Sequence, residues 1–226
     1  MATIWIIFGL FALVSWLISN QLKNKFRQFS KIPVSYGMTG KDVAEKMLHD
    51  NDIYDVRVVS VRGELTDHYN PAKKTVNLSE AVYSSNSVAA AAVAAHECGH
   101  AVQHAHAYSW LQMRTALVPV VSIASRWVQW ILLAGIIMLQ SFPQLLLAGI
   151  VLFAATTVFS IITLPVEINA SKRALAWLEN SGITTAQTQP RAREALRWAA
   201  YTYVVAALGS LATLFYYIMI FMGRRD

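Results

Sequence analysis

His96-Glu97-Cys98-Gly99-His100 forms the pattern HExxH, directly after the run Ser87-Val88-Ala89-Ala90-Ala91-Ala92-Val93-Ala94-Ala95. Ser is a favoured helix N-cap and Ala is the best helix former, so the whole stretch predicts one helix. On a helix the two histidines lie one turn apart, about 6 Å along the axis and ~40° around it, so both rings can face one metal ion. Glu97 lies beside them, where a carboxylate can accept a proton from metal-bound water. We predict a zinc site with His96 and His100 as ligands and Glu97 as the catalytic base, rather than a buried pair of structural histidines.

A hydrolytic zinc site needs a third protein ligand, and His106 is one candidate. It stands ten residues after His96, the spacing of the longer pattern HExxHxxGxxH. That pattern needs a glycine to break the helix, and this chain has Gln103 at the glycine position. An unbroken helix carries His106 ~80° around the axis from His96, on the side away from His100, and ~9 Å beyond His100, so we disfavour it.

A carboxylate from a later helix is the alternative third ligand. Four acidic residues follow the motif: Glu167, Glu179, Glu194 and Asp226. Glu167 follows Pro165, a residue favoured at helix starts, and we expect it to open a helix over 166–178. The residues three, four and seven positions after it are the small Ala170, Ser171 and Ala174, which favour close packing against another helix. We therefore predict Glu167 as the third ligand.

The composition of the chain is that of a membrane protein. Of its 226 residues 55% are hydrophobic, which is more than a soluble domain of this size usually has. The excess lies in four stretches, 4–19, 116–139, 144–164 and 199–222. The last two exceed the ~20 residues that cross a bilayer as a helix, and the first is borderline. Arg126 interrupts the second stretch, so it either faces protein or water within the membrane or marks the interface, with the span beginning near Trp127.

Basic residues set the expected orientation of these spans, because loops rich in Lys and Arg stay in the cytoplasm. Nine of them follow the first span or lie between the last two: Lys23, Lys25, Arg27, Lys31, Lys172, Arg173, Arg191, Arg193 and Arg197. The turn at 140–143 is uncharged, while Arg224 and Arg225 at the C-terminal end oppose the bias. We expect a plasma membrane, which in a bacterial cell is the cytoplasmic membrane. The HExxH motif should lie on its cytoplasmic side. The net charge of +6 fits contact with anionic lipid. Because no stripe of basic and aromatic residues accompanies it, we expect no nucleic-acid partner.

The polar segment at 30–86 predicts a small α+β structure. Thr39 can cap a short helix with apolar positions at Val43, Ala44, Met47 and Leu48. Short strands are expected at 56–61, 65–69 and 75–78, with a turn at 70–73. So small a sheet needs the motif helix to cover it, and it would leave one edge open for an extended peptide. We take the strand around Asn77 as the candidate edge.

Three segments carry a resemblance to a known family. They are 95–105 around HExxH, 165–174 around Glu167, and Leu65-Thr66-Asp67-His68-Tyr69-Asn70-Pro71. They resemble the YugP-type membrane neutral zinc metallopeptidases, and the likeness covers nearly the whole chain. It implies a zinc peptidase with His96, His100 and Glu167 as ligands and Glu97 as acid and base. The family is similar to the HtpX and CAAX prenyl protease group, which has an aspartate where this chain has Ser171.

These observations predict a mostly α integral membrane protein with about four transmembrane helices and a small cytoplasmic α+β zincin-like domain. The expected parts are an anchor at 1–20, a cytoplasmic zincin-like part at 21–115, a transmembrane hairpin at 116–164, a cytoplasmic helical part at 165–198 and a last span at 199–226. The expected activity is Zn²⁺-dependent hydrolysis of peptides or membrane proteins at the cytoplasmic face. His104 and Ser171 are candidates to support a ligand or the oxyanion.

Two rival functions use the same residues. A zinc-binding scaffold without catalysis would have the same sequence pattern. A metal or proton transporter is disfavoured, because the spans at 144–164 and 199–222 contain no ionisable Asp, Glu, Lys, Arg or His.

Overall fold

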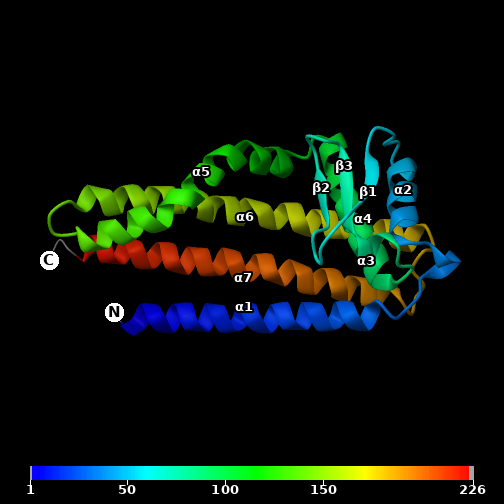
Figure 1. The fold of residues 1–226 in the computed structure, drawn as a ribbon, viewed down its shortest axis with the longest axis horizontal. Helices are drawn as coiled ribbons and strands as arrows, with labels where there is room; N and C mark the ends of the chain where they lie inside the picture. Colours follow the sequence, from blue (N-terminus) through cyan, green and yellow to red (C-terminus); the bar gives the residue numbers. More distant parts are fainter. Residues whose placement is uncertain (1, 224–226) are drawn as a thin grey trace. The chain divides into compact units, whose positions relative to one another are not determined.

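The computed structural model describes residues 2–223 as a mostly helical chain with one small sheet (Figure 1). Its elements are α1(Ala2–Phe29), the 3-10 turn η1(Ser35–Gly37), α2(Gly40–Asp50), β1(Arg57–Val61), β2(His68–Asn70), β3(Thr75–Ser79), α3(Glu80–Tyr83), α4(Val88–Ala105), α5(Ser109–Ile137), α6(Pro143–Asn180) and α7(Gln189–Met222). The prediction of a mostly α chain with a small α+β part is confirmed.

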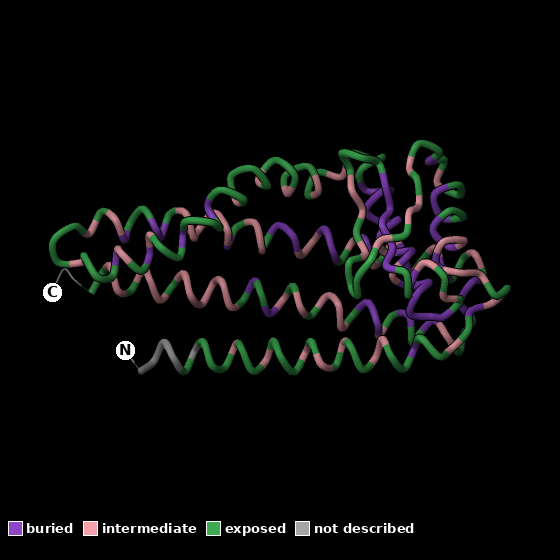
Figure 2. The backbone as a smooth tube through the Cα atoms, in the orientation of Figure 1, coloured by how far each residue is buried: buried purple, intermediate pink, exposed green. Residues whose placement is uncertain are grey.

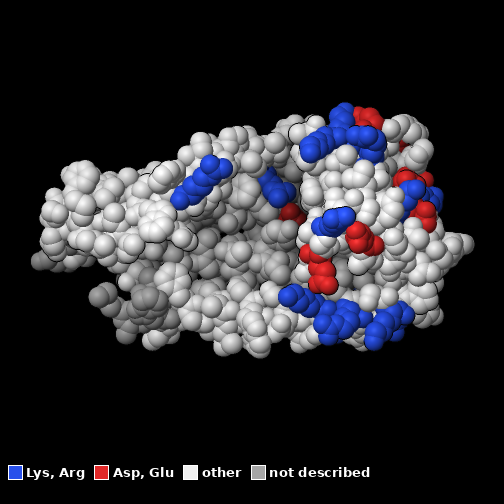
Figure 3. All heavy atoms as spheres, viewed as in Figure 1, with Lys and Arg blue, Asp and Glu red and all other residues white. Residues whose placement is uncertain are grey.

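The chain divides into two compact units. One contains the residues up to Leu17, those from Gln112 to Leu164 and those from Thr202 on, and we call it the apolar unit. The other contains Ile18–Leu111 and Pro165–Tyr201, and we call it the site unit. The charged side chains visible in Figure 3 gather mainly over the site unit, and the face of the apolar unit is nearly free of them.

Three of the described helices are long and apolar enough to cross a membrane: α5, α6 and α7. The helices α5 and α6 pack closely where an added Cβ at Gly135 would lie 2.5 Å from the Cα of Leu146, and the hairpin at 116–164 as a transmembrane unit stays a prediction. Arg126 is exposed on α5. The anchor predicted at 1–20 begins with a residue outside the described range, and α1 as a fourth span stays a prediction.

The expectation that a new helix opens at Pro165 is wrong. The helix α6 runs unbroken from Pro143 to Asn180 with Pro165 inside it. A proline within a helix removes one backbone hydrogen bond, whereas ending one helix and starting another leaves four carbonyl and four N–H groups without helical partners. Continuing through Pro165 is therefore the less costly arrangement, and it carries the apolar segment directly into the segment with Glu167.

The helix α2 confirms the capping and burial predicted from the sequence. Thr39 and Asp42 form a capping box, in which the Thr39 N–H donates to Asp42 Oδ2 at 2.9 Å and the Asp42 N–H donates to Thr39 Oγ1 at 3.3 Å. The predicted apolar positions Val43, Ala44, Met47 and Leu48 are all buried. Figure 2 shows that buried residues concentrate in this part of the site unit, where α2, α4 and β3 share one core.

The sheet has the strand order β1-β3-β2, with β1 parallel and β2 antiparallel to β3. Asn77 lies on β3, paired with Val59 on one side and His68 on the other. The prediction that Asn77 marks an open edge is therefore wrong, because β3 is the central strand and its residues are buried. The edges are β1 and β2, and β2 is the one next to the motif helix α4.

Candidate metal centre

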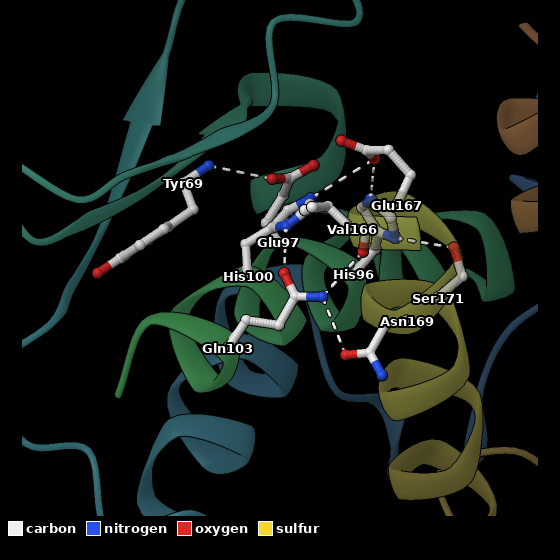
Figure 4. A network of polar contacts seen from close by, with 9 residues as sticks. All are labelled: Tyr69, His96, Glu97, His100, Gln103, Val166, Glu167, Asn169 and Ser171. Carbon is white, nitrogen blue, oxygen red and sulfur yellow. Dashed lines mark hydrogen bonds and ion pairs between the residues drawn. The ribbon is translucent and has the colours of Figure 1, made fainter. Parts of the chain in front are cut away.

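Helix α4 and the part of α6 that lies in the site unit bring His96, His100 and Glu167 together (Figure 4). His96 and His100 lie on α4, which Ser87 caps by accepting a hydrogen bond from the Ala90 N–H. Glu167 lies on α6. Each residue offers one ligand atom, and these atoms all lie within 4.8 Å of one another.

The distances from Glu167 to the two histidines are close to those in a tetrahedral zinc site. Zinc binds imidazole nitrogen and carboxylate oxygen at about 2.0–2.2 Å, which places two tetrahedral ligand atoms about 3.3 Å apart. Glu167 Oε2 lies 3.2 Å from His96 Nε2 and 3.6 Å from His100 Nε2. His100 and Glu167 are buried and His96 is only slightly exposed, so a bound ion would be shielded from bulk solvent on the ligand side.

Small residues allow α4 and α6 to approach closely enough for this geometry. Gly99 faces Ala170, and a Cβ at Gly99 would lie 2.7 Å from the Ala170 carbonyl oxygen. Ala170 and Ala174, two of the small residues noted after Glu167, are fully buried. Gly99 is thus required here by space, because any side chain would push the two ligand-bearing helices apart.

Glu97 is buried next to the ligands but is bound to the sheet. Its Oε2 accepts a hydrogen bond of 3.0 Å from the backbone N–H of Tyr69 on β2. This N–H is on the outer edge of the sheet, because β2 pairs only with β3. The ring of Tyr69 points away from the ligand cluster (Figure 4), and its hydroxyl lies 2.8 Å from His104 Nδ1.

The carboxylates around His100 favour its protonated form in the absence of metal. Burial opposes a charge on this ring, but the hydrogen bond and charge of Glu167, the charge of Glu97 and the hydrogen bond to Gln103 together raise the pKa of His100 above its usual value. A carboxylate that attracts a proton to this position also attracts a metal cation, so protons and metal compete for the same place.

Three further residues predicted as candidates, Ser171, His104 and His106, differ in their contacts with the ligand cluster. Ser171 Oγ lies 3.1 Å from His96 Nδ1, where it can orient that ring as expected. His104 contacts Tyr69 rather than Glu167. His106 Nδ1 lies 2.8 Å from the Val102 carbonyl oxygen at the end of an unbroken α4, so the structure does not bring His106 to the cluster.

The other later carboxylates in the described chain are used elsewhere. Glu194 forms an ion pair with Lys25 at 2.9 Å. Glu179 Oε2 accepts a hydrogen bond from Gln189 at 3.3 Å, and Asp226 is outside the described residues. Of the carboxylates that follow the motif, Glu167 is thus the one that the described structure places beside the two histidines.

Sequence reasoning missed Gln103 and Asn169 as parts of this site. Gln103 drew attention only because it is not a glycine. It is in fact fully buried and hydrogen-bonded to His100 and to α6. One sequence feature could have indicated the role of Gln103. It is a polar residue three positions after the ligand His100, on the face of the helix that packs against the core.

Two histidines of an HExxH helix and a glutamate from a later helix form the ligand set of the gluzincin class of zinc peptidases. The profile of the family described as "Putative neutral zinc metallopeptidase" matches residues 4–222. The chain therefore belongs to this family. It is 43% identical over 206 residues to the "Putative membrane protease YugP" of Bacillus subtilis (strain 168), which covers 91% of each chain. No solved structure matches the chain significantly.

Proposed function

We propose that this protein is a membrane-integrated zinc endopeptidase that hydrolyses peptide bonds at the cytoplasmic face of a bacterial plasma membrane. The observation that carries the proposal is the convergence of Glu167 with His96 and His100 at ligand distances, with Glu97 adjacent. Family membership and the three apolar helices support it. The proposed ligands are His96, His100 and Glu167.

In the proposed reaction the three ligands would hold zinc and Glu97 would transfer the proton. Zinc, when bound, acts as a Lewis acid that lowers the pKa of water toward about 7 and polarises a carbonyl group. Glu97 accepts a proton from the attacking water and delivers it to the nitrogen of the leaving amine. The carbon–nitrogen bond of the substrate breaks, and the two products carry the new carboxyl and amino groups.

We propose that the substrate binds along the outer edge of β2. Its Tyr69 N–H lies 3.0 Å from the catalytic carboxylate in the described structure. An extended peptide that pairs with this edge would bond through its backbone, largely without regard to its sequence. The proposed substrates are peptides or unfolded segments of membrane proteins, and the lipid bilayer is the other partner.

The cytoplasmic placement rests on the basic residues of the site unit. Lys23, Arg27 and Arg193 are among those that are exposed. Such residues near the ends of membrane helices favour the cytoplasmic side and contact with anionic lipid. We propose that nucleic acid is not among the partners of this protein.

Hydrolysis of unfolded casein by the purified chain in liposomes tests the activity. Removal of metal by 1,10-phenanthroline should abolish hydrolysis, and added zinc should restore it. Hydrolysis that persists in protein shown by elemental analysis to be metal-free would refute the proposal. A zinc-replete protein that never cleaves casein or itself would instead support the non-catalytic scaffold.

A further inference from the structure

Gln103 is a fully buried amide between the ligand His100 and the segment of α6 that contains Glu167. A buried amide is costly unless its donors and acceptor are bonded. Gln103 meets this condition with three contacts. Its Nε2 lies 2.8 Å from the Val166 carbonyl oxygen and 3.0 Å from Asn169 Oδ1, and its Oε1 lies 3.0 Å from His100 Nδ1 (Figure 4).

The chemistry of the neighbours determines which way this amide points. Arg173 Nε donates to Asn169 Oδ1 at 2.8 Å, and a guanidinium group can only donate, so Asn169 must present its oxygen there. The Val166 carbonyl oxygen can only accept. Gln103 therefore directs its NH₂ group at these two oxygens, and its own oxygen faces His100.

The orientation of Gln103 in turn determines the tautomer of His100. An amide oxygen only accepts, so the proton of the neutral ring must lie on Nδ1. The lone pair is then on Nε2, the atom that lies 3.6 Å from Glu167 Oε2. A neutral imidazole binds metal through such a lone pair, and its other nitrogen is normally bonded to an oriented partner.

We propose that Gln103 is a positioning residue that holds His100 in the metal-binding tautomer and ties it to the α6 segment of Glu167. The proposal rests on the metal site put forward above. The partner of the other histidine differs in kind, because the hydroxyl of Ser171 can either donate to or accept from His96 Nδ1. Ser171 thus orients the His96 ring but does not select its tautomer.

A tautomer measurement on the metal-free wild-type protein tests the proposal without zinc. Histidine-selective ¹⁵N labelling and long-range ¹H–¹⁵N correlation, at a pH above the raised pKa of His100 so that the ring is neutral, report which ring nitrogen is protonated. We expect His100 with the proton on Nδ1, and Asn169→Asp should preserve this state because a carboxylate also accepts from Gln103 and Arg173. A wild-type His100 ring protonated on Nε2 would overturn the proposal.

Zinc affinity, from competition with a chromogenic chelator, provides the second readout. Gln103→Leu should lower it about 10- to 100-fold, as losses of such supporting partners typically do. Gln189→Leu is the matched control. Gln189 is also buried and bonded on both ends of its amide, to the Leu175 carbonyl oxygen at 2.9 Å and to Thr184 Oγ1 at 2.6 Å, and it contacts no ligand.

The control should lose stability but keep wild-type zinc affinity. A folded Gln103→Leu variant with wild-type affinity would contradict the proposal. If the wild type shows the Nδ1 tautomer but binds no zinc, the metal site falls while the role of Gln103 toward His100 stands. The two proposals are thereby separable.

Discussion

Glu167 Oε2 lies 3.2 Å from His96 Nε2, although 71 positions separate the two residues in the chain. Helix α6 brings this carboxylate to the motif helix. Glu167→Ala should therefore weaken zinc binding by more than the about 10- to 100-fold typical of supporting residues. His106→Ala should leave the affinity unchanged, since His106 bonds the Val102 carbonyl oxygen at the end of α4.

Chelator competition on the two purified variants compares them directly, and Ser171→Ala should fall between them. A silent Glu167→Ala together with a damaging His106→Ala would mean that α4 breaks near Gln103 in the functional protein. The gluzincin assignment would then fail.

The contact between Gly99 and Ala170 predicts that one methyl group will damage the site. A Cβ at Gly99 would lie 2.7 Å from a backbone oxygen that cannot move alone, so Gly99→Ala should separate α4 from α6. We expect a loss of about 1–3 kcal/mol in the free energy of unfolding and weaker zinc binding. Gly9→Ala is the matched control, because a Cβ there would meet no atom within 4 Å. Equal stability of the two variants by chemical denaturation would show that the helices are not packed this closely.

The capping box of α2 predicts a stability contribution that depends on pH. The hydrogen bond from the Thr39 hydroxyl, followed by that from its backbone N–H, lowers the pKa of Asp42. Since the pKa is lower in the folded state, the contribution is present above the unfolded value of about 3.9 and is lost as the pH falls through the folded value.

Asp42→Asn should therefore destabilise the protein by about 0.5–1 kcal/mol at pH 7. The difference from the wild type should shrink as the pH falls below about 4 and through the lowered pKa of folded Asp42, because the protonated carboxyl group is then uncharged like the amide. Denaturation midpoints measured across this range check the prediction. A difference that grows on acidification would have the wrong sign.

The orientation in the membrane predicts opposite labelling of two engineered cysteines. Gln140 lies in the uncharged turn between α5 and α6, Thr185 lies between α6 and α7, and both are exposed. In intact cells an impermeant maleimide should label Gln140→Cys and not Thr185→Cys. The natural Cys98 is buried and gives little background. The reverse pattern would move the site to the external face.

Local sequence signals predicted much of the site unit. Thr39 and Ser87 cap helices where their side chains suggested. Each short strand overlaps its expected range, and the absence of a glycine at Gln103 correctly indicated a continuous α4. These features depend on residues within one or two turns of each other, which is the range over which propensity and capping act.

The errors involve relations between distant segments. The order of three short strands is not encoded in their local patterns, so the prediction of an edge strand at Asn77 is wrong and β3 is central. Pro165 is compatible with both a helix start and a helix interior, and the balance of backbone hydrogen bonds decides between them. The role of Gln103 depends on acceptors 63 and 66 positions away and could be read only from the structure.

Glu97→Gln separates metal binding from catalysis and so tests the central claim most directly. The amide oxygen can still accept from the Tyr69 N–H, which lies 3.0 Å from Glu97 Oε2, but the amide cannot accept a proton from water. Zinc content by elemental analysis and casein hydrolysis are measured on the same purified protein. We predict one zinc per chain and a loss of hydrolysis of at least about 10²-fold. Full hydrolysis by the metal-replete variant would contradict the peptidase mechanism.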